Sequence, residues 1–267
     1  METTDALAPH WSLDQIDYER IDVERVRQRD DIFMLVCSAS FIESGSDTYT
    51  RNLIEYFADD REFGAWLRER WEPEELQHGR ALRRYLQQVW TEFDWEAGYA
   101  EFFAEYAKLC VIDELEPTRG QELVARCIVE TGTTTYYQAL AGLAGEPVLH
   151  GLASRIRADE VGHYKQFYHQ FLKYREREGL GRAKVVAAIW RRVAELRRSD
   201  SDIALRHAAR ALGGSADATR QQLYAQLAQR YPVDLAVRMA LKPLRLRAGL
   251  QRCAVRPLGA VMRHLMH

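Results

Sequence analysis

The sequence has few of the residues that staple small folds or interrupt helices. Its 267 residues include 4 cysteines and 7 prolines. The cysteines lie far apart and form no Cys-x-x-Cys pair, which argues against a zinc ribbon and against a disulfide framework. They are Cys37, Cys110, Cys127 and Cys253. A reducing environment suits such a chain, so we expect a cytoplasmic protein.

Long apolar runs and strand-like alternation are also missing. No apolar run approaches the roughly 18 residues needed to span a membrane. The first residues, Met1–Leu13, lack the basic start and apolar core of a signal peptide. Alternation of apolar and polar residues persists nowhere, whereas helical periodicity recurs along the chain. These absences predict an all-α protein with no membrane span.

The net charge is only −2, but its distribution is uneven. Residues 1–172 hold 17 Lys and Arg against 32 Asp and Glu, and residues 173–267 hold 20 against 7. The two parts could attract each other, a dimer could cover the basic surface, or the basic part could dock an acidic partner. We expect no nucleic-acid partner.

Two glutamates stand in apolar, helix-like stretches. Glu43 directly follows the run Ile32–Ile42, and Glu130 directly follows Leu123–Val129. A carboxylate in such a setting is costly unless it is paired or bound to a cation. Both glutamates are therefore candidate metal ligands.

Each of these glutamates is followed, about 30 residues later, by Glu-x-x-His. The motifs are Glu75 with His78 and Glu160 with His163. Residues three apart share one face of a helix, so each motif could hold a metal ion from one side. The two motifs are 85 residues apart, and the two isolated glutamates are 87 apart. This spacing indicates a repeated helix pair with four carboxylates and two imidazoles, the set that four-helix bundles use to bind two iron or manganese ions.

The periodicity divides the chain into a lead-in, a bundle and a basic tail. Residues 1–22 look irregular, residues 23–178 form the bundle, and residues 179–267 form a basic helical region. Gly45 lies inside the first helix and predicts close packing or a distortion there. The predicted bundle helices are Asp22–Ala58, Glu62–Val89, Asp94–Ile112, Gln121–Leu143 and Val148–Arg177. A turn is expected at Gly145-Glu146-Pro147.

Pro73 and the two glutamates after it allow a purely local interpretation. Proline followed by acids is typical of a helix N-terminus, where the negative charge complements the helix dipole. This interpretation is sufficient for Glu74. For Glu75 we prefer the ligand role, because His78 and the matched repeat would otherwise both be coincidences.

With these residues in view, the chain resembles the soluble acyl-carrier-protein desaturases, a di-iron branch of the ferritin-like superfamily. The resemblance covers roughly residues 30–175. Its pieces are Glu43 with Tyr49 six places on, Trp71-x-x-Glu74-Glu75-x-x-His78-Gly79, Glu130 with Thr133, and Ala158-Asp159-Glu160-x-x-His163. It implies a ferritin-like four-helix bundle with extra C-terminal helices.

The resemblance also implies roles for individual residues. Glu43 and His78 would bind one iron, Glu130 and His163 the other, and Glu75 and Glu160 would bridge the pair. Asp159 would accept a hydrogen bond from a ligand histidine. Thr133 would lie near bound dioxygen. Manganese in place of iron stays open, since these ligand types suit both.

The implied function is that of a di-iron oxidoreductase that uses O₂ and an external, ferredoxin-like electron donor. Its substrate would be an acyl chain on acyl carrier protein, and a homodimer is expected. One alternative is a hydroxylase or N-oxygenase that acts on a small molecule. A second is a ferritin-like protein that oxidises and stores iron, which would require a shell of many subunits.

Overall fold

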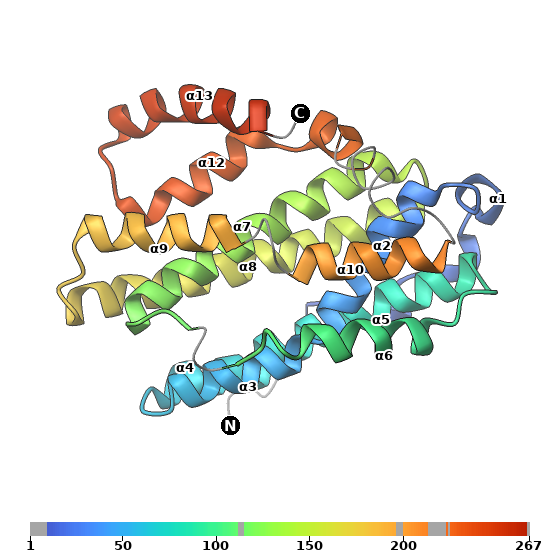
Figure 1. The fold of residues 1–267 in the computed structure, drawn as a ribbon, viewed down its shortest axis with the longest axis horizontal. Helices are drawn as coiled ribbons and strands as arrows, with labels where there is room; N and C mark the ends of the chain where they lie inside the picture. Colours follow the sequence, from blue (N-terminus) through green and yellow to red (C-terminus); the bar gives the residue numbers. More distant parts are fainter. Residues whose placement is uncertain (1–9, 112–114, 196–199, 213–222, 224, 266–267) are drawn as a thin grey trace.

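The computed structural model describes residues 10–111, 115–195, 200–212, 223 and 225–265, and no β-strand occurs among them. The ribbon in Figure 1 is a bundle of long helices with further helices laid over it. The prediction of an all-α fold is confirmed. None of the described helices is both long enough and apolar enough to cross a membrane.

The bundle region follows two short 3₁₀ turns, at Leu13–Gln15 and Tyr18–Arg20. A π-helical segment, Leu67–Trp71, lies between its fourth and fifth α-helices. The helices are α1 (Val23–Val26), α2 (Asp30–Ser44), α3 (Ser46–Tyr56), α4 (Arg61–Trp66), α5 (Glu72–Val89), α6 (Trp95–Tyr106), α7 (Arg119–Ala144) and α8 (Pro147–Arg177). The predicted end of the third helix, Ile112, lies outside the described residues.

Two helix pairs make up the bundle. α7 packs against α8 along most of its length, and α2 packs against α5. Between α7 and α8 the chain turns at Gly145, whose φ of 64° favours glycine. The Glu146 carboxylate then accepts hydrogen bonds from the backbone N–H groups of Val148 and Leu149, and Pro147 occupies the first turn of α8. This turn was expected from the sequence, and it folds the second half of the repeat into a hairpin.

The first predicted helix, Asp22–Ala58, is wrong as a single element. Asp22 caps the start of α1 by accepting a hydrogen bond from the Arg25 N–H, and the helical path stops after Val26. It breaks again at Gly45, whose φ and ψ are −94° and 1°. A Cβ atom at Gly45 would lie 2.9 Å from the ring of Tyr106. The predicted close packing at Gly45 is therefore confirmed, and it bends the chain between α2 and α3.

Pro73 does not begin a helix that follows a loop. The chain is helical from Arg61 through to Val89, and the π-helical segment lies immediately before α5. Proline inside a helix removes one backbone hydrogen bond and clashes with the preceding turn. The wider π turn directly before Pro73 coincides with that disturbance, and such turns are frequent at functional sites.

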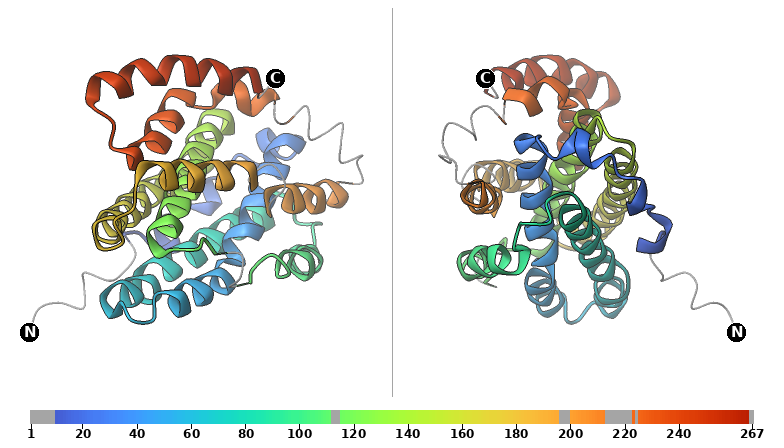
Figure 2. Two further views of the ribbon diagram at one scale, coloured as in Figure 1. Left: turned by 60° about the vertical axis from the view of Figure 1, so that its left-hand side comes forward. Right: turned by 90° about the vertical axis from the view of Figure 1, so that its right-hand side faces the viewer.

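The helices after the bundle include α9 (Arg182–Glu195), α10 (Asp200–Ala211), α12 (Val233–Leu241) and α13 (Ala248–Leu265), with a 3₁₀ turn at Lys242–Leu244. α10 packs on α2 and α6, whereas α9 and α12 pack on α7. Ala208 of α10 and Val185 of α9 are fully buried within the apolar clusters of the bundle. These C-terminal helices therefore share the bundle's core, and Figure 2 shows them along one side of it.

Some of the unevenly distributed charges form ion pairs within the molecule. Arg206 of α10 lies 3.0 Å from the Glu105 carboxylate of α6, and Arg191 of α9 pairs with the buried Glu116. The basic tail and the acidic bundle therefore attract each other at these points.

Gly79 permits the close approach of α5 to α2. A Cβ atom there would lie 2.5 Å from the Ser44 Oγ and 2.8 Å from the Ser44 backbone nitrogen. We expect Gly79→Ala to lower the free energy of unfolding by about 1 to 3 kcal/mol, the usual range for overpacking a core. Denaturant unfolding of the metal-free protein measures this change.

Gly151 of α8 is the matched control, because a Cβ atom there meets nothing within 4 Å. Gly151→Ala should raise the free energy of unfolding by roughly 0.5 to 1 kcal/mol, through helix propensity alone. Equal effects of the two substitutions would contradict the packing argument.

Candidate metal centre

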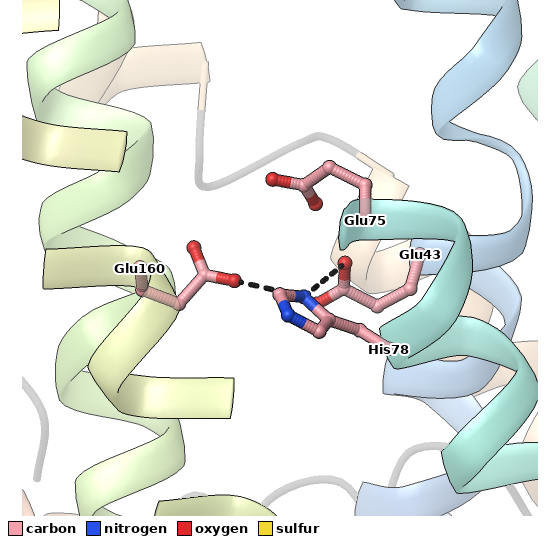
Figure 3. A group of neighbouring side chains, drawn as sticks. All are labelled: Glu43, Glu75, His78 and Glu160. Atoms are coloured by element: carbon pink, nitrogen blue, oxygen red, sulfur yellow. Dashed lines mark ion pairs between the residues drawn. The ribbon is translucent and has the colours of Figure 1, made fainter. Parts of the chain in front are cut away.

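Six acidic and imidazole side chains from four helices meet inside the bundle. Glu160 reaches across from α8 toward His78 of α5, and Glu43 of α2 lies on the other side of that ring (Figure 3). All six are buried, with the most accessible, Glu75, 8% exposed. The full set is Glu43, Glu75, His78, Glu130, Glu160 and His163, the same six residues that the sequence selects as candidate ligands.

The six residues form two overlapping groups. In each group one atom per residue lies within 4.8 Å of every other. Glu75 and Glu160 belong to both groups, whereas each remaining pair belongs to one. The first group adds Glu43 and His78, and the second adds Glu130 and His163. Two ions held in this way would be neighbours that share two carboxylates.

The distances between donor atoms suit shared metal ions. The Nδ1 atom of His78 lies 3.3 Å from Glu160 Oε1 and 3.7 Å from Glu43 Oε2. The Nδ1 atom of His163 lies 3.1 Å from Glu75 Oε1 and 3.7 Å from Glu130 Oε2. Two ligand atoms at roughly 2.1 Å from one ion, at angles near 90° to 110°, lie about 3.0 to 3.4 Å apart. The observed separations are close to these values.

Several of these atoms lack any other partner within the described part of the chain. They are the Nδ1 atoms of His78 and His163, Glu130 Oε2 and Glu160 Oε1, all buried and without a hydrogen bond. A buried polar atom left in this state costs about 1 to 3 kcal/mol. Divalent cations between the two groups would satisfy all four atoms. The residues therefore form buried carboxylate–imidazole groups able to bind a pair of metal ions.

The outer nitrogens of both histidines are held by carboxylates from the opposite motif. His78 Nε2 lies 3.1 Å from Asp159 Oδ2, and His163 Nε2 lies 2.9 Å from Glu74 Oε2. A partner on the outer nitrogen fixes the ring and turns the other nitrogen inward. Glu74 and Asp159 are also 85 residues apart, so the internal repeat includes the residues that support the histidines.

The interpretation of Glu74 as a simple helix-start acid is wrong. Its side chain is 2% exposed, and besides His163 it pairs with Arg70 Nη2 at 2.8 Å. A helix-start acid needs only a local explanation, whereas this contact joins residues 89 positions apart. The 85-residue spacing between Glu74 and Asp159 is the signal in the sequence for this role.

Trp11, in the predicted irregular lead-in, forms a hydrogen bond with Asp159. Its indole N–H donates to Asp159 Oδ2 at 2.7 Å, and its ring stacks nearly parallel to His78 with centroids 6.1 Å apart. The backbone carbonyl of Trp11 accepts a hydrogen bond from Gln77. No pattern in the sequence pointed to this contact, because Trp11 and Asp159 are 148 residues apart.

Three residues of α7 contact the ligands or lie beside them. The Thr133 hydroxyl donates to Glu160 Oε2 at 2.6 Å, and the Tyr137 hydroxyl donates to Glu43. Thr134 is fully buried, and its hydroxyl has no hydrogen-bond partner among the described residues. Glu130, Thr134 and Tyr137 follow helical spacing and share one face of α7. The sequence singled out Thr133 but missed Tyr137.

Burial and crowding change the pKa values of the cluster. Burial, and next the nearby Glu75, raise the pKa of Glu43; burial and the nearby Glu160 raise that of Glu130. Burial alone would lower the pKa of both histidines, but hydrogen bonds to carboxylates outweigh it and raise the pKa of each. Without cations, protons offset the negative charge. Four carboxylates could instead balance two divalent ions.

Comparison with known proteins agrees with this centre. No protein-family model matches the chain. It is 33% identical over 156 residues to the protein named "Putative acyl-(acyl-carrier-protein) desaturase DesA2" in two strains of Mycobacterium tuberculosis. The match covers 57% of this chain and 53% of the relative, so the chain spans about half of the relative's length.

Solved structures share the fold. A variant of an R2-like ligand-binding oxidase with an aerobically reconstituted Mn/Fe cofactor superposes with a TM-score of 0.52, and another variant with an Fe/Fe cofactor with 0.50. Both are 16% identical to this chain and cover 83% of it and 87% of their own length. The chain therefore has the ferritin-like helical fold and resembles an acyl-carrier-protein desaturase.

The crossed support of the histidines predicts separable effects on the two sites. Asp159→Asn should weaken binding of the ion that His78 would hold. Glu74→Gln should weaken binding of the ion that His163 would hold. Loss of such a supporting carboxylate commonly costs 10- to 100-fold in metal affinity. Titration with a divalent ion should then show one weakened and one retained site in each variant.

Glu72→Gln is the control, because Glu72 lies in the same turn of α5 but outside both metal-ligand groups. It should leave both affinities unchanged. Equal weakening of both sites by either test substitution would contradict the crossed arrangement.

Proposed function

We propose that this protein is a di-iron oxidoreductase that uses O₂ to desaturate an acyl chain carried by acyl carrier protein. The observation that carries the proposal is the pair of buried ligand groups that share Glu75 and Glu160. The 33% identity to the mycobacterial desaturase-like protein favours the acyl substrate. Glu43 with His78 would complete the coordination of one ion, and Glu130 with His163 that of the other. Manganese could replace iron in one or both positions.

The reaction has a simple balance. An acyl CH₂–CH₂ unit, O₂, two electrons and two protons give CH=CH and two waters, so an external electron donor is required. When bound, the two metal ions would supply the O₂ chemistry that makes an unactivated C–H bond reactive. The chain's own contribution is a buried bundle core with little access for water and a set of fixed ligands.

Individual side chains would fix the orientation of the candidate ligands in that core. Asp159 and Glu74 hold the histidine rings, and Trp11 in turn holds Asp159. The Thr133 hydroxyl donates to Glu160 and is the polar group best placed to exchange a proton at that carboxylate.

The basic tail offers a surface for an acidic carrier protein. α13 lies on the outside of the molecule (Figure 1) and exposes Arg247, just before its start, as well as Arg252 and Arg256. No acidic partner is seen for these three residues within the described part of the chain. Exposed positive charge of this kind attracts an acidic partner and speeds its association at low salt.

A second candidate is a hydroxylase or N-oxygenase that acts on a small polar molecule. The buried Thr134 hydroxyl favours it, because a hydroxyl without a partner beside Glu130 could bind a polar group of a substrate. An acyl chain would leave this hydroxyl unsatisfied. The homodimer inferred from the resemblance stays a prediction, and sizing in solution would test it.

The central prediction concerns Glu160. Wild-type protein loaded with ferrous iron under nitrogen should bind two irons per chain and, with reductant, O₂ and acyl carrier protein, form a double bond in the acyl chain. Glu160→Ala should lose both irons, or retain one, and form no product, because it removes a ligand shared by both groups. Iron analysis and mass spectrometry of the released acyl chain measure these outcomes.

Glu176→Ala, an exposed carboxylate of the same helix, should behave as wild type. Two bound irons with a carrier protein that is neither bound nor altered would reject the acyl substrate and leave the oxygenase candidate. No specific iron in the wild type would reject both.

A further inference from the structure

A pocket of about 490 Å³ lies outside the metal centre, between the bundle and the C-terminal helices. Its walls come from α7, α8, the start of α12 and α13, and Figure 2 shows α12 and α13 beside the C-terminal part of α7. Its size is that of a site for a metabolite-sized molecule. The polar lining includes Gln138, Arg157, Tyr231, Asp234, Arg238 and Arg263.

The lining is positively charged. Three arginines face one carboxylate, Asp234, which already pairs with Arg263 at 3.3 Å. Within the described residues, Arg157 and Arg238 have no acidic partner. The Nε atom of Arg157 is buried and makes no hydrogen bond, and the same is true of Gln138 Oε1. Arginine stays charged at any ordinary pH, so a half-buried guanidinium without a partner requires an explanation.

The start of α12 adds to the positive potential of the same pocket. Pro232–Leu235, at the N-terminal end of α12, contribute to the lining, and no side chain caps this helix. The start of a helix favours negative charge. The Tyr231 hydroxyl also lines the pocket and lies 2.7 Å from the Thr135 hydroxyl. The arginines and the helix start therefore both favour an anion.

α13 packs closely against the start of α12 and so bounds one side of the pocket. A Cβ atom on Gly259 would lie 3.1 Å from Asp234 Oδ1 and 3.5 Å from a methyl group of Val233. The Arg263–Asp234 pair joins α13 to the start of α12 at this place. Four residues of the lining are apolar and could contact carbon atoms attached to the anionic group: Ala228, Pro232, Val233 and Leu235.

We propose that this pocket is a binding site for a small organic anion, whose phosphate or carboxylate group lies between Arg157 and Arg238. Guanidinium groups bind both anions through paired, charge-assisted hydrogen bonds. The site is separate from the metal centre, although Arg157 precedes Glu160 by one helical turn. It does not depend on the proposed reaction, because none of its lining residues is a candidate metal ligand.

The test is isothermal titration of the full chain with hexyl phosphate and, separately, with hexanoate. Wild-type protein should bind at least one of them, and the tighter ligand identifies the anionic group. Arg157→Gln and Arg238→Gln should each weaken binding by about tenfold or more, the usual effect of losing a charged hydrogen bond. Arg157→Lys, which keeps the charge, should recover part of the affinity.

Arg155→Gln is the matched control, since Arg155 is exposed on the same helix and does not line the pocket. It should change the affinity less than twofold. The proposal is overturned if neither anion binds, or if all three glutamine variants bind equally well. Glu160→Ala should retain anion binding, so failure of this site and failure of the metal centre give different results.

Discussion

The dominant constraint in this protein is the burial of four carboxylates and two imidazoles in one apolar bundle. Burial alone opposes charge on each of these groups, and the carboxylates also repel one another. Such a cluster persists only if cations, protons and hydrogen bonds offset those costs. Most features near the centre serve that end, because they either fix the direction of a ligand or fill the space around it.

The supporting contacts are arranged with the same internal symmetry as the ligands. Each Glu-x-x-His motif is preceded by an acid that holds the histidine of the other motif, Glu74 for His163 and Asp159 for His78. The two helix pairs are therefore joined through hydrogen bonds as well as through shared carboxylates. Gly79 supports the geometry differently, since its missing side chain lets α5 lie directly against α2. Candidate metal ligands and a close helix contact thus meet within one turn of α5.

Much of the centre could be predicted from spacing, and the failures have physical reasons. A carboxylate in an apolar helical stretch and a histidine three residues after a glutamate are local signals, so the sequence selects as candidate ligands the same six residues that the fold brings together. The bend at Gly45 was missed as a helix boundary because the amphipathic pattern continues through it, while contact with Tyr106 comes from 61 residues away. Glu74 was misinterpreted because a local rule explained it adequately. The local rule carries no information about burial.

The amino-acid sequence by itself determined which candidate ligands lie together on a helix, because helical spacing alone puts Glu75 with His78 and Glu160 with His163 on common faces. Only the tertiary structure decided which imidazole nitrogen faces the centre, which acids support the rings, and that Trp11 contacts Asp159. It also formed the arginine-lined pocket from separate helices. These features join residues far apart in the chain, and side-chain periodicity extends only over neighbouring turns.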